Sequence, residues 1–119
     1  MSIWERIFKT LKDNGIEVYP PATHKGECRK PYVVVKQDGS TQVGDFSSER
    51  VYYQFLLYVP QNKYQELDNF ENEVKGVLAT ELYPLLMPTG SNMPDYFEEE
   101  KKAHMRSFMY TNNRRNKHL

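Results

Sequence analysis

Hydrophobic residues near the start of the chain recur at the spacing of one helical face. Charged residues of both signs fill the other positions. Ser2 and Glu5 fit a capping box at the beginning of this segment, and Asn14-Gly15 fits a left-handed stop at its end. The pattern therefore predicts an amphipathic helix that packs on a core through Ile3, Trp4, Ile7, Phe8 and Leu11.

Alternation of apolar and polar residues predicts strands in four later segments. Residues 16–19 form a short strand that Pro20-Pro21 ends, and residues 32–36 form a β-branched strand. Residues 50–59 give the strongest strand pattern, and they are apolar on both faces, which favours a central strand that is covered on both sides. Residues 103–111 are predicted to be the last strand.

A second apolar stripe with helical spacing follows the strongest strand and stops before Pro84. It consists of Leu67, Phe70, Val74, Val77, Leu78 and Leu82. The element order is then α-β-β-β-α-β, with residues 95–102 fitting either a helical turn or an additional charged strand. Two helices with one apolar face each can cover a mainly antiparallel sheet, so residues 1–119 are predicted to form one α+β domain.

Three segments lack a periodic apolar pattern. Residues 38–48 are polar and contain Gly44, and we expect a long mobile loop or the extended tip of a hairpin there. Residues 86–95 contain two prolines and a glycine and are predicted to be a loop. Residues 113–119 are polar and basic, and we expect them to form a mobile tail.

Composition excludes several classes of protein. The chain has 16 basic and 16 acidic residues, so it is not built to wrap nucleic acid by bulk charge. A single cysteine leaves no internal disulfide. No apolar run is long enough for a membrane-spanning helix, and no secretory signal is recognised, so we expect no membrane partner.

The charges are unevenly distributed although they sum to zero. Residues 61–100 hold two basic and nine acidic residues, whereas residues 101–119 hold six basic residues and no acidic one. Such segments can pair within one subunit or between neighbours, or they can be ordinary solvated surfaces. As a candidate subunit interface we take three acidic and four basic residues: Glu66, Glu71, Glu73, Arg106, Arg114, Arg115 and Lys117.

Few residues suggest catalysis or metal binding. His24 and Cys28 are four positions apart, but a zinc site needs three or four ligands and the other histidines are distant. A nucleophilic Cys28 would need a base and an orienting group, which the sequence does not identify. We therefore predict no enzyme activity, no metal and no cofactor.

Short motifs along the chain resemble one family. They are GIEVYPP at 15–21, GECRKPYVV at 26–34, YVP at 58–60 and KAHM at 102–105, with a helix at each expected place. The sequence is similar to the tail-terminator or tail-completion proteins of long-tailed phages and prophages. Head-completion and minor capsid proteins from the same gene cluster are a neighbouring class of similar size.

The resemblance implies an α+β subunit that forms a homo-oligomer, a hexameric ring, in the virion neck after assembly in the host cytoplasm. Its implied partners are tail-tube and head-connector proteins, and it implies no catalytic residue. The alternative is a small binding module that contacts nucleic acid or a protein through the basic tail and a sheet rich in tyrosine, of which the chain has nine. Nucleic acid is not expected to be the main partner.

Overall fold

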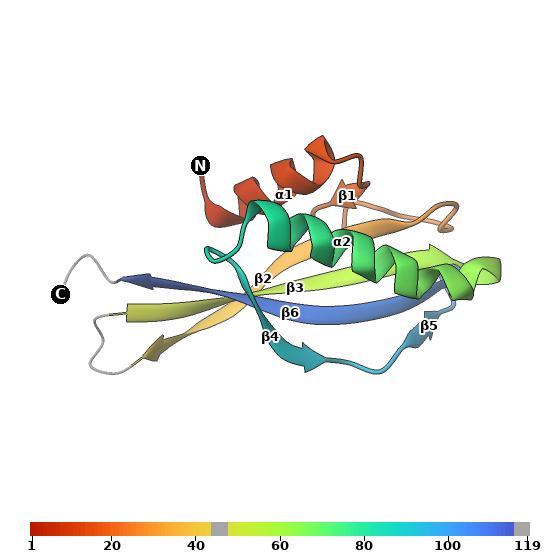
Figure 1. Ribbon diagram of the computed structural model, residues 1–119. Helices are drawn as coiled ribbons and strands as arrows, with labels where there is room; N and C mark the ends of the chain where they lie inside the picture. Colours follow the sequence, from red (N-terminus) through yellow and green to blue (C-terminus); the bar gives the residue numbers. More distant parts are fainter. Residues whose placement is uncertain (44–47, 116–119) are drawn as a thin grey trace.

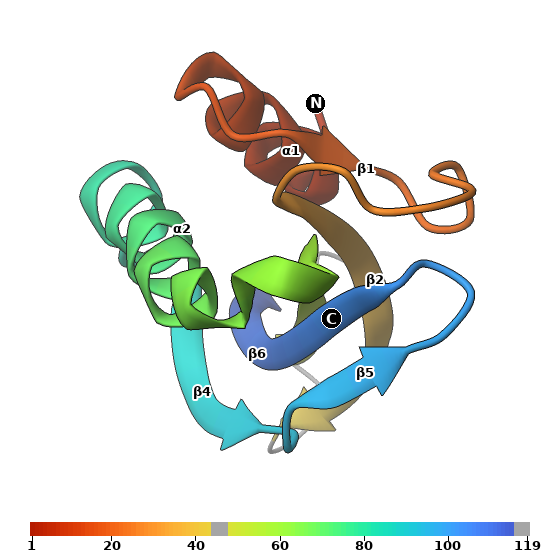
Figure 2. The ribbon, with the colours of Figure 1, turned by 90° about the vertical axis from the view of Figure 1, so that its right-hand side faces the viewer.

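Two helices lie on one face of a twisted sheet (Figure 1). The computed structural model describes residues 1–43 and 48–115. Helix α1 spans Ile3–Asp13 and helix α2 spans Leu67–Glu81. Figure 2 shows that both helices cover the same side of the sheet.

The ends of α1 follow the sequence signals. The Glu5 amide donates to Ser2 Oγ at 3.0 Å, and the Ser2 amide donates to Glu5 Oε1 at 3.2 Å, so the predicted capping box is confirmed. Asn14 caps the other end, and Gly15 follows with φ of +78°. A residue without a Cβ adopts that left-handed conformation at little cost, so the helix stops where predicted.

The sheet has six strands and confirms the α+β class. Its strands are β1 (Val18–Tyr19), β2 (Tyr32–Val43), β3 (Ser48–Pro60), β4 (Met87–Asn92), β5 (Tyr96–Glu98) and β6 (Ala103–Arg115). The order across the sheet is β1-β2-β3-β6-β4, and β5 also pairs with β6. All pairs are antiparallel except β1 with β2, so the prediction of a mainly antiparallel sheet is confirmed.

The main core lies between the two helices and the sheet. Strand β3 is central, as predicted, and Phe55 and Leu57 are fully buried beneath the helices. From the helices, Ile7, Leu11 and Val74 are also fully buried in this cluster. The opposite face of β3 is less covered than expected, because most of its side chains there are only half-buried.

A second, smaller cluster covers one end of that opposite face. It consists of Cys28, Tyr32, Tyr58 and Ala103, with Tyr19, Val34, Leu56 and Met105 packed beside it. The loop between β1 and β2 is held there because the Cys28 amide donates to the Lys101 carbonyl at 2.7 Å. This loop therefore supplies the partial cover on the side away from the helices.

Strands β2, β3 and β6 extend into both segments that were expected to be mobile, and the pairing of β2 with β3 fits the extended-hairpin alternative for 38–48. Of residues 38–48, those from 38 to 43 belong to β2 and Ser48 begins β3, while 44–47 lie outside the described residues. Of the tail, residues 113–115 extend β6, and 116–119 lie outside the described part. Where the structure describes side chains, Asp38, Gly39 and Ser40 are exposed, so no buried face imposed an alternating pattern on this strand.

These extended ends form an arm that projects past the helices (Figure 1). We define the arm as residues 38–43, 48–50 and 113–115, which continue β2, β3 and β6. The arm and the helix-covered body make the molecule elongated, with extents of 51 × 26 × 24 Å. The described part of the chain contains no helix that is long and apolar enough to cross a membrane.

Two further strands lie in segments for which no strand was firmly predicted. Strand β4 lies in the predicted loop at 86–95, and β5 lies in the undecided segment at 95–102. Strands β4 and β5 both lie along the outer edge of β6. Pro88 is tolerated in β4 because this is an edge strand, where a missing amide donor costs little. Apart from Met87, β4 is exposed, so its residues carry no apolar alternation that could reveal a strand.

Candidate subunit interface

Arg106 is the centre of an ion-pair network inside the subunit. Its Nε and Nη2 donate to the two oxygens of Asp95 at 2.8 Å each, and its Nη1 donates to Glu71 Oε1 at 2.9 Å. Nη1 also donates to Asp68. Only 17% of the Arg106 side chain is exposed. The network joins β6 to α2 and to the connection between β4 and β5.

Electrostatics keeps this network charged. The hydrogen bonds from Arg106 lower the pKa of Asp95 to about 2, although partial burial opposes the shift. Burial also opposes ionisation of Glu71, but hydrogen bonds from Lys75 and Arg106 outweigh it and the pKa lies below its ordinary value. Asp95 above all raises the pKa of the Arg106 guanidinium. Charge-assisted bidentate pairs of this kind are the strong ones.

Two of the seven interface candidates are therefore paired with each other within one subunit. The sequence left open whether the acidic and basic segments meet inside a subunit or between neighbours, and for Arg106 and Glu71 the structure gives the first answer. Asp68 and Asp95 complete the network, and the sequence analysis did not single them out. No local pattern links residues that are 38 and 11 positions away from Arg106.

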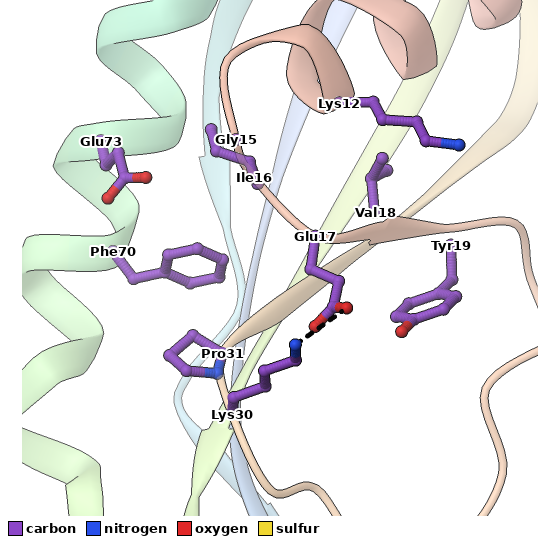
Figure 3. Close-up of a pocket in the computed structure, with 10 residues that line it drawn as sticks. All are labelled: Lys12, Gly15, Ile16, Glu17, Val18, Tyr19, Lys30, Pro31, Phe70 and Glu73. Carbon is purple, nitrogen blue, oxygen red and sulfur yellow. Dashed lines mark ion pairs between the residues drawn. The ribbon is translucent and has the colours of Figure 1, made fainter.

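Glu73 lines a groove between α2 and the start of β1 (Figure 3), and Glu66 lines its continuation toward the start of α2. The groove consists of two adjoining hollows of about 620 and 420 Å³, which share Lys30, Pro31, Phe70 and Glu73. Within the described part of the chain, no ion pair is recorded for either Glu66 or Glu73. Both carboxylates are therefore available to a partner.

The groove is not uniformly acidic. Lys30 Nζ lies 3.3 Å from Glu17 Oε1, as the dashed line in Figure 3 shows. Lys12 also lines this hollow, and Arg29 and Lys63 line the adjoining one. A groove with charges of both signs around the apolar ring of Phe70 suits a protein partner better than a small ion of one sign.

The three basic candidates of the tail are not brought to this groove. Arg114 and Arg115 stand opposite Glu49 and Ser48 at the end of β6, and Lys117 lies outside the described residues. In Figure 1 this end of β6 lies at the far end of the molecule from the first turns of α2. Contact between the tail and Glu66 or Glu73 would therefore need a second subunit, and it stays a prediction.

Cys28 is a structural residue in this fold. It is 3% exposed, and its Sγ donates to the Lys30 carbonyl at 3.3 Å. Burial raises the pKa of the thiol to about 11, which disfavours the nucleophilic thiolate. His24 packs its ring on Tyr32, with centroids 4.1 Å apart. Among the described residues, no group of three histidine, cysteine or acidic side chains is placed to hold a metal ion.

One contact that the sequence did not reveal lies on the edge of β2. The Trp4 indole Nε1 donates to the Val35 carbonyl at 2.8 Å. The apolar pattern assigned Trp4 to the core, whereas the structure leaves it half-buried at the side of the sheet. The unusual residue type was the available signal, because a buried indole N–H needs an acceptor.

The sequence matches no protein-family profile, and a search of curated proteins finds no relative.

Proposed function

We propose that this protein is a structural subunit of the neck of a long-tailed phage, which forms a ring, completes the tail and joins it to the head connector. The sequence resemblance supports this proposal through its motifs and element order. The α+β fold agrees with the α+β subunit that the resemblance implies. A subunit of this kind works by binding, so the proposal requires no catalytic residue.

The observation that carries the proposal is the difference between the two ends of the subunit. One end is a helix-covered body with a groove beside α2, and the other is a projecting arm of three paired strands. A ring whose subunits associate head to tail needs two different surfaces on each subunit. An elongated molecule with unlike ends provides them.

The experiment is a mass measurement combined with a binding assay. Sedimentation of the purified protein over a range of concentrations should show a closed species several times the 14.1 kDa subunit. Tail tubes reconstituted from the tail-tube protein of the same genome should bind that ring at one end, which electron microscopy would show. A protein that stays monomeric at every concentration, and on tail tubes as well, would contradict the proposal.

A parallel titration with duplex DNA tests the alternative function. The proposed subunit should bind DNA only weakly, because the chain carries equal numbers of basic and acidic residues. Tight, salt-dependent binding of DNA by a monomer would favour the nucleic-acid module. The two functions therefore give opposite results in the same pair of measurements.

A further inference from the structure

The outer edge of β2 is closed along the body and open along the arm. Strand β1 pairs with β2 only at Val33 and Val34, and the Val33 amide donates to the Glu17 carbonyl. Next along the edge, the Trp4 indole Nε1 donates a hydrogen bond to the Val35 carbonyl. Beyond Lys36 no described element pairs with this edge of β2.

The outer edge of β6 is likewise paired along the body and without a described partner strand along the arm. The Ser107 carbonyl accepts from the Met93 amide, and the Met109 carbonyl accepts from Thr89 Oγ1. Strand β4 reaches as far as Thr111 in its register with β6. Along residues 112–115 no described element pairs with the edge away from β3. The arm thus has an open edge on each side.

The register identifies which arm groups point outward. In an antiparallel pair, successive residues point their amide and carbonyl alternately toward and away from the partner strand. The Val35 backbone carbonyl points away from β3. Phe55 stands opposite Val35, so the backbone groups of Phe55 point toward β6, and the alternation continues along β3. By this alternation Gln42, opposite Glu49, points outward from β2.

The same alternation places the Asn113 and Arg115 backbone groups on the outer edge of β6, next after the outward groups of Ser107, Met109 and Thr111. Exposed edges are usually protected by charges, prolines or short length. Residues 37–43 contain one charged residue, Asp38, and no proline. The register shift between Gln37 and Ser40 interrupts this edge, and a bulge gives some protection. Beyond it, residues 40–43 form an edge with little protection.

The two edges fit each other better than either fits itself. Strands β2 and β6 both run antiparallel to β3, so they run parallel to each other. When the β2 edge of one copy pairs with the β6 edge of the next, the sheet continues from subunit to subunit in the same direction. The first and last subunits of such a chain each keep one unpaired edge. Such a contact repeats until a ring closes, whereas β2 against β2 stops at a dimer.

Charge agrees with this pairing. Residues 37–43 carry one acidic residue and no basic one, and residues 112–115 carry two arginines. Two copies of the β6 edge would bring four arginines together, which would be unfavourable. The β2 edge carries no basic residue over 37–43, so pairing it with the β6 edge avoids this repulsion.

We propose that the arm is the junction between subunits, in which the β2 edge at residues 40–43 pairs in parallel with the β6 edge at residues 112–115 of a second copy. The inference rests on the proposed function, since it names the contact that closes the ring. Backbone pairing of a free edge with another strand is a common mode of association. The occupant is this chain itself, because one arm supplies both complementary edges.

The test removes one outward amide at a time. Gln42→Pro removes the outward donor of β2, and Asn113→Pro removes that of β6, while the inward hydrogen bonds to β3 are kept. The matched controls are Gln42→Ala and Asn113→Ala. We expect each proline variant to sediment as a monomer under conditions in which wild type and both alanine controls form the ring. Circular dichroism and thermal melting establish that the variants are folded.

Mixing the two proline variants gives the decisive result. Gln42→Pro keeps a competent β6 edge and Asn113→Pro keeps a competent β2 edge, so an equal mixture should form a one-to-one pair and nothing larger. A proline variant that dimerises alone would overturn the head-to-tail junction. Rings formed by both proline variants would overturn the arm junction and leave the proposed function intact.

Cross-linking keeps the inference testable if a proline variant does not fold. A Gln42→Cys, Arg114→Cys double variant in a Cys28→Ser background should give a ladder of disulfide-linked oligomers on a non-reducing gel, because these two positions stand opposite each other in the proposed parallel register. Each single cysteine variant should give monomers or dimers only. Absence of the ladder from a sample that sediments as a ring would overturn the junction. A wild-type chain that is monomeric alone and on tail tubes would instead contradict the proposed function itself.

Discussion

The body and the arm are built from the same three long strands but are stabilised differently. In the body, β3 buries Phe55 and Leu57 completely beneath the helices. In the arm, Asp38, Gly39 and Ser40 are exposed, and Val43 is the one large apolar residue among the arm's twelve positions. Burial stabilises the body, whereas backbone pairing holds the arm extended. A strand can therefore extend well beyond the core that its sequence pattern reveals.

The largest expected effect is in the core of the body. Phe55→Ala should lower the free energy of unfolding by about 3–5 kcal/mol, because a fully buried ring is removed and a cavity is left. The matched change in the arm, Ser40→Ala, should stay within about 0.5 kcal/mol. Chemical denaturation of both variants measures the difference. A loss below about 1 kcal/mol for Phe55→Ala would show that the body does not depend on this face of β3.

The sequence predicted the body well because burial imposes periodicity. The helical spacing of Ile7 and Leu11, the capping box and the central position of β3 are all correct. Strand β4 and the full length of the arm strands were not predicted. At residues 37–40 and 88–92, where the structure describes the side chains, both faces are exposed and nothing imposes an alternating pattern. Pro88 and Gly90 then suggested a loop, although an edge strand tolerates both.

The interface candidates show the same limit. A charge imbalance between segments was visible in the sequence, but which charges meet depends on the register of β6 against the rest of the fold. Arg106 faces Glu71, Asp68 and Asp95 inside the subunit. The open edges at Gln42 and Asn113 are backbone features, and side-chain patterns do not report them.

The next effect is the removal of Arg106 from its network. Arg106→Ala should cost about 2–3 kcal/mol in unfolding free energy, because Asp95 and Glu71 lose a partner that is mostly shielded from solvent. Arg106→Lys should recover only part of this loss, since an ammonium cannot form the two-pronged contact with Asp95. The control is Lys9→Ala, which breaks an exposed pair with Asp13 and should cost less than about 0.5 kcal/mol.

The Arg106 result is read from denaturation curves at neutral pH. Equal losses for Arg106→Ala and Lys9→Ala would contradict the view that the network fastens α2 and the β4–β5 connection to β6. Arm substitutions such as Ser40→Ala should be additive with Arg106→Ala, because distant sites without shared partners are independent. Strong coupling between them would break the separation of body and arm.

A smaller effect should appear in the pH dependence of stability. The pKa of Asp95 is about 2 in the folded protein, below the ordinary value of about 3.9. The unfolded chain therefore binds the proton more readily, so this carboxylate stabilises the fold fully above about pH 4, and the contribution is lost as the pH falls toward 2. Because solvent reaches the side chain, we expect about 1–2 kcal/mol.

The measurement compares wild type with Asp95→Asn between pH 5 and pH 2. Wild type should lose stability more steeply as the pH falls, and the two curves should converge near the acid end. Parallel curves would show that Asp95 does not contribute through its charge.

The smallest effect on stability, and the most informative one about assembly, comes from the charge of the arm. Reversing Arg114 and Arg115 to Glu should change unfolding by less than about 0.5 kcal/mol and should weaken ring formation several-fold at low salt. At about 0.15 M ionic strength screening acts over about 8 Å, so the difference from wild type should shrink there. Sedimentation at low and high salt measures both results.

A second charge reversal then identifies the surface that the arginines meet. If the β6 edge lies beside the β2 edge of the next copy, Asp38→Lys should partly restore rings formed by the reversed variant. If the basic tail instead reaches the groove of a neighbour, Glu66→Lys with Glu73→Lys should restore them and Asp38→Lys should not. That second outcome would contradict the arm junction, because Glu66 immediately precedes α2 and Glu73 lies in its first half, which Figure 1 shows far from the arm. If the reversed variant forms rings equally well at every salt concentration, charge does not stabilise the junction. Backbone pairing alone would then hold the subunits together.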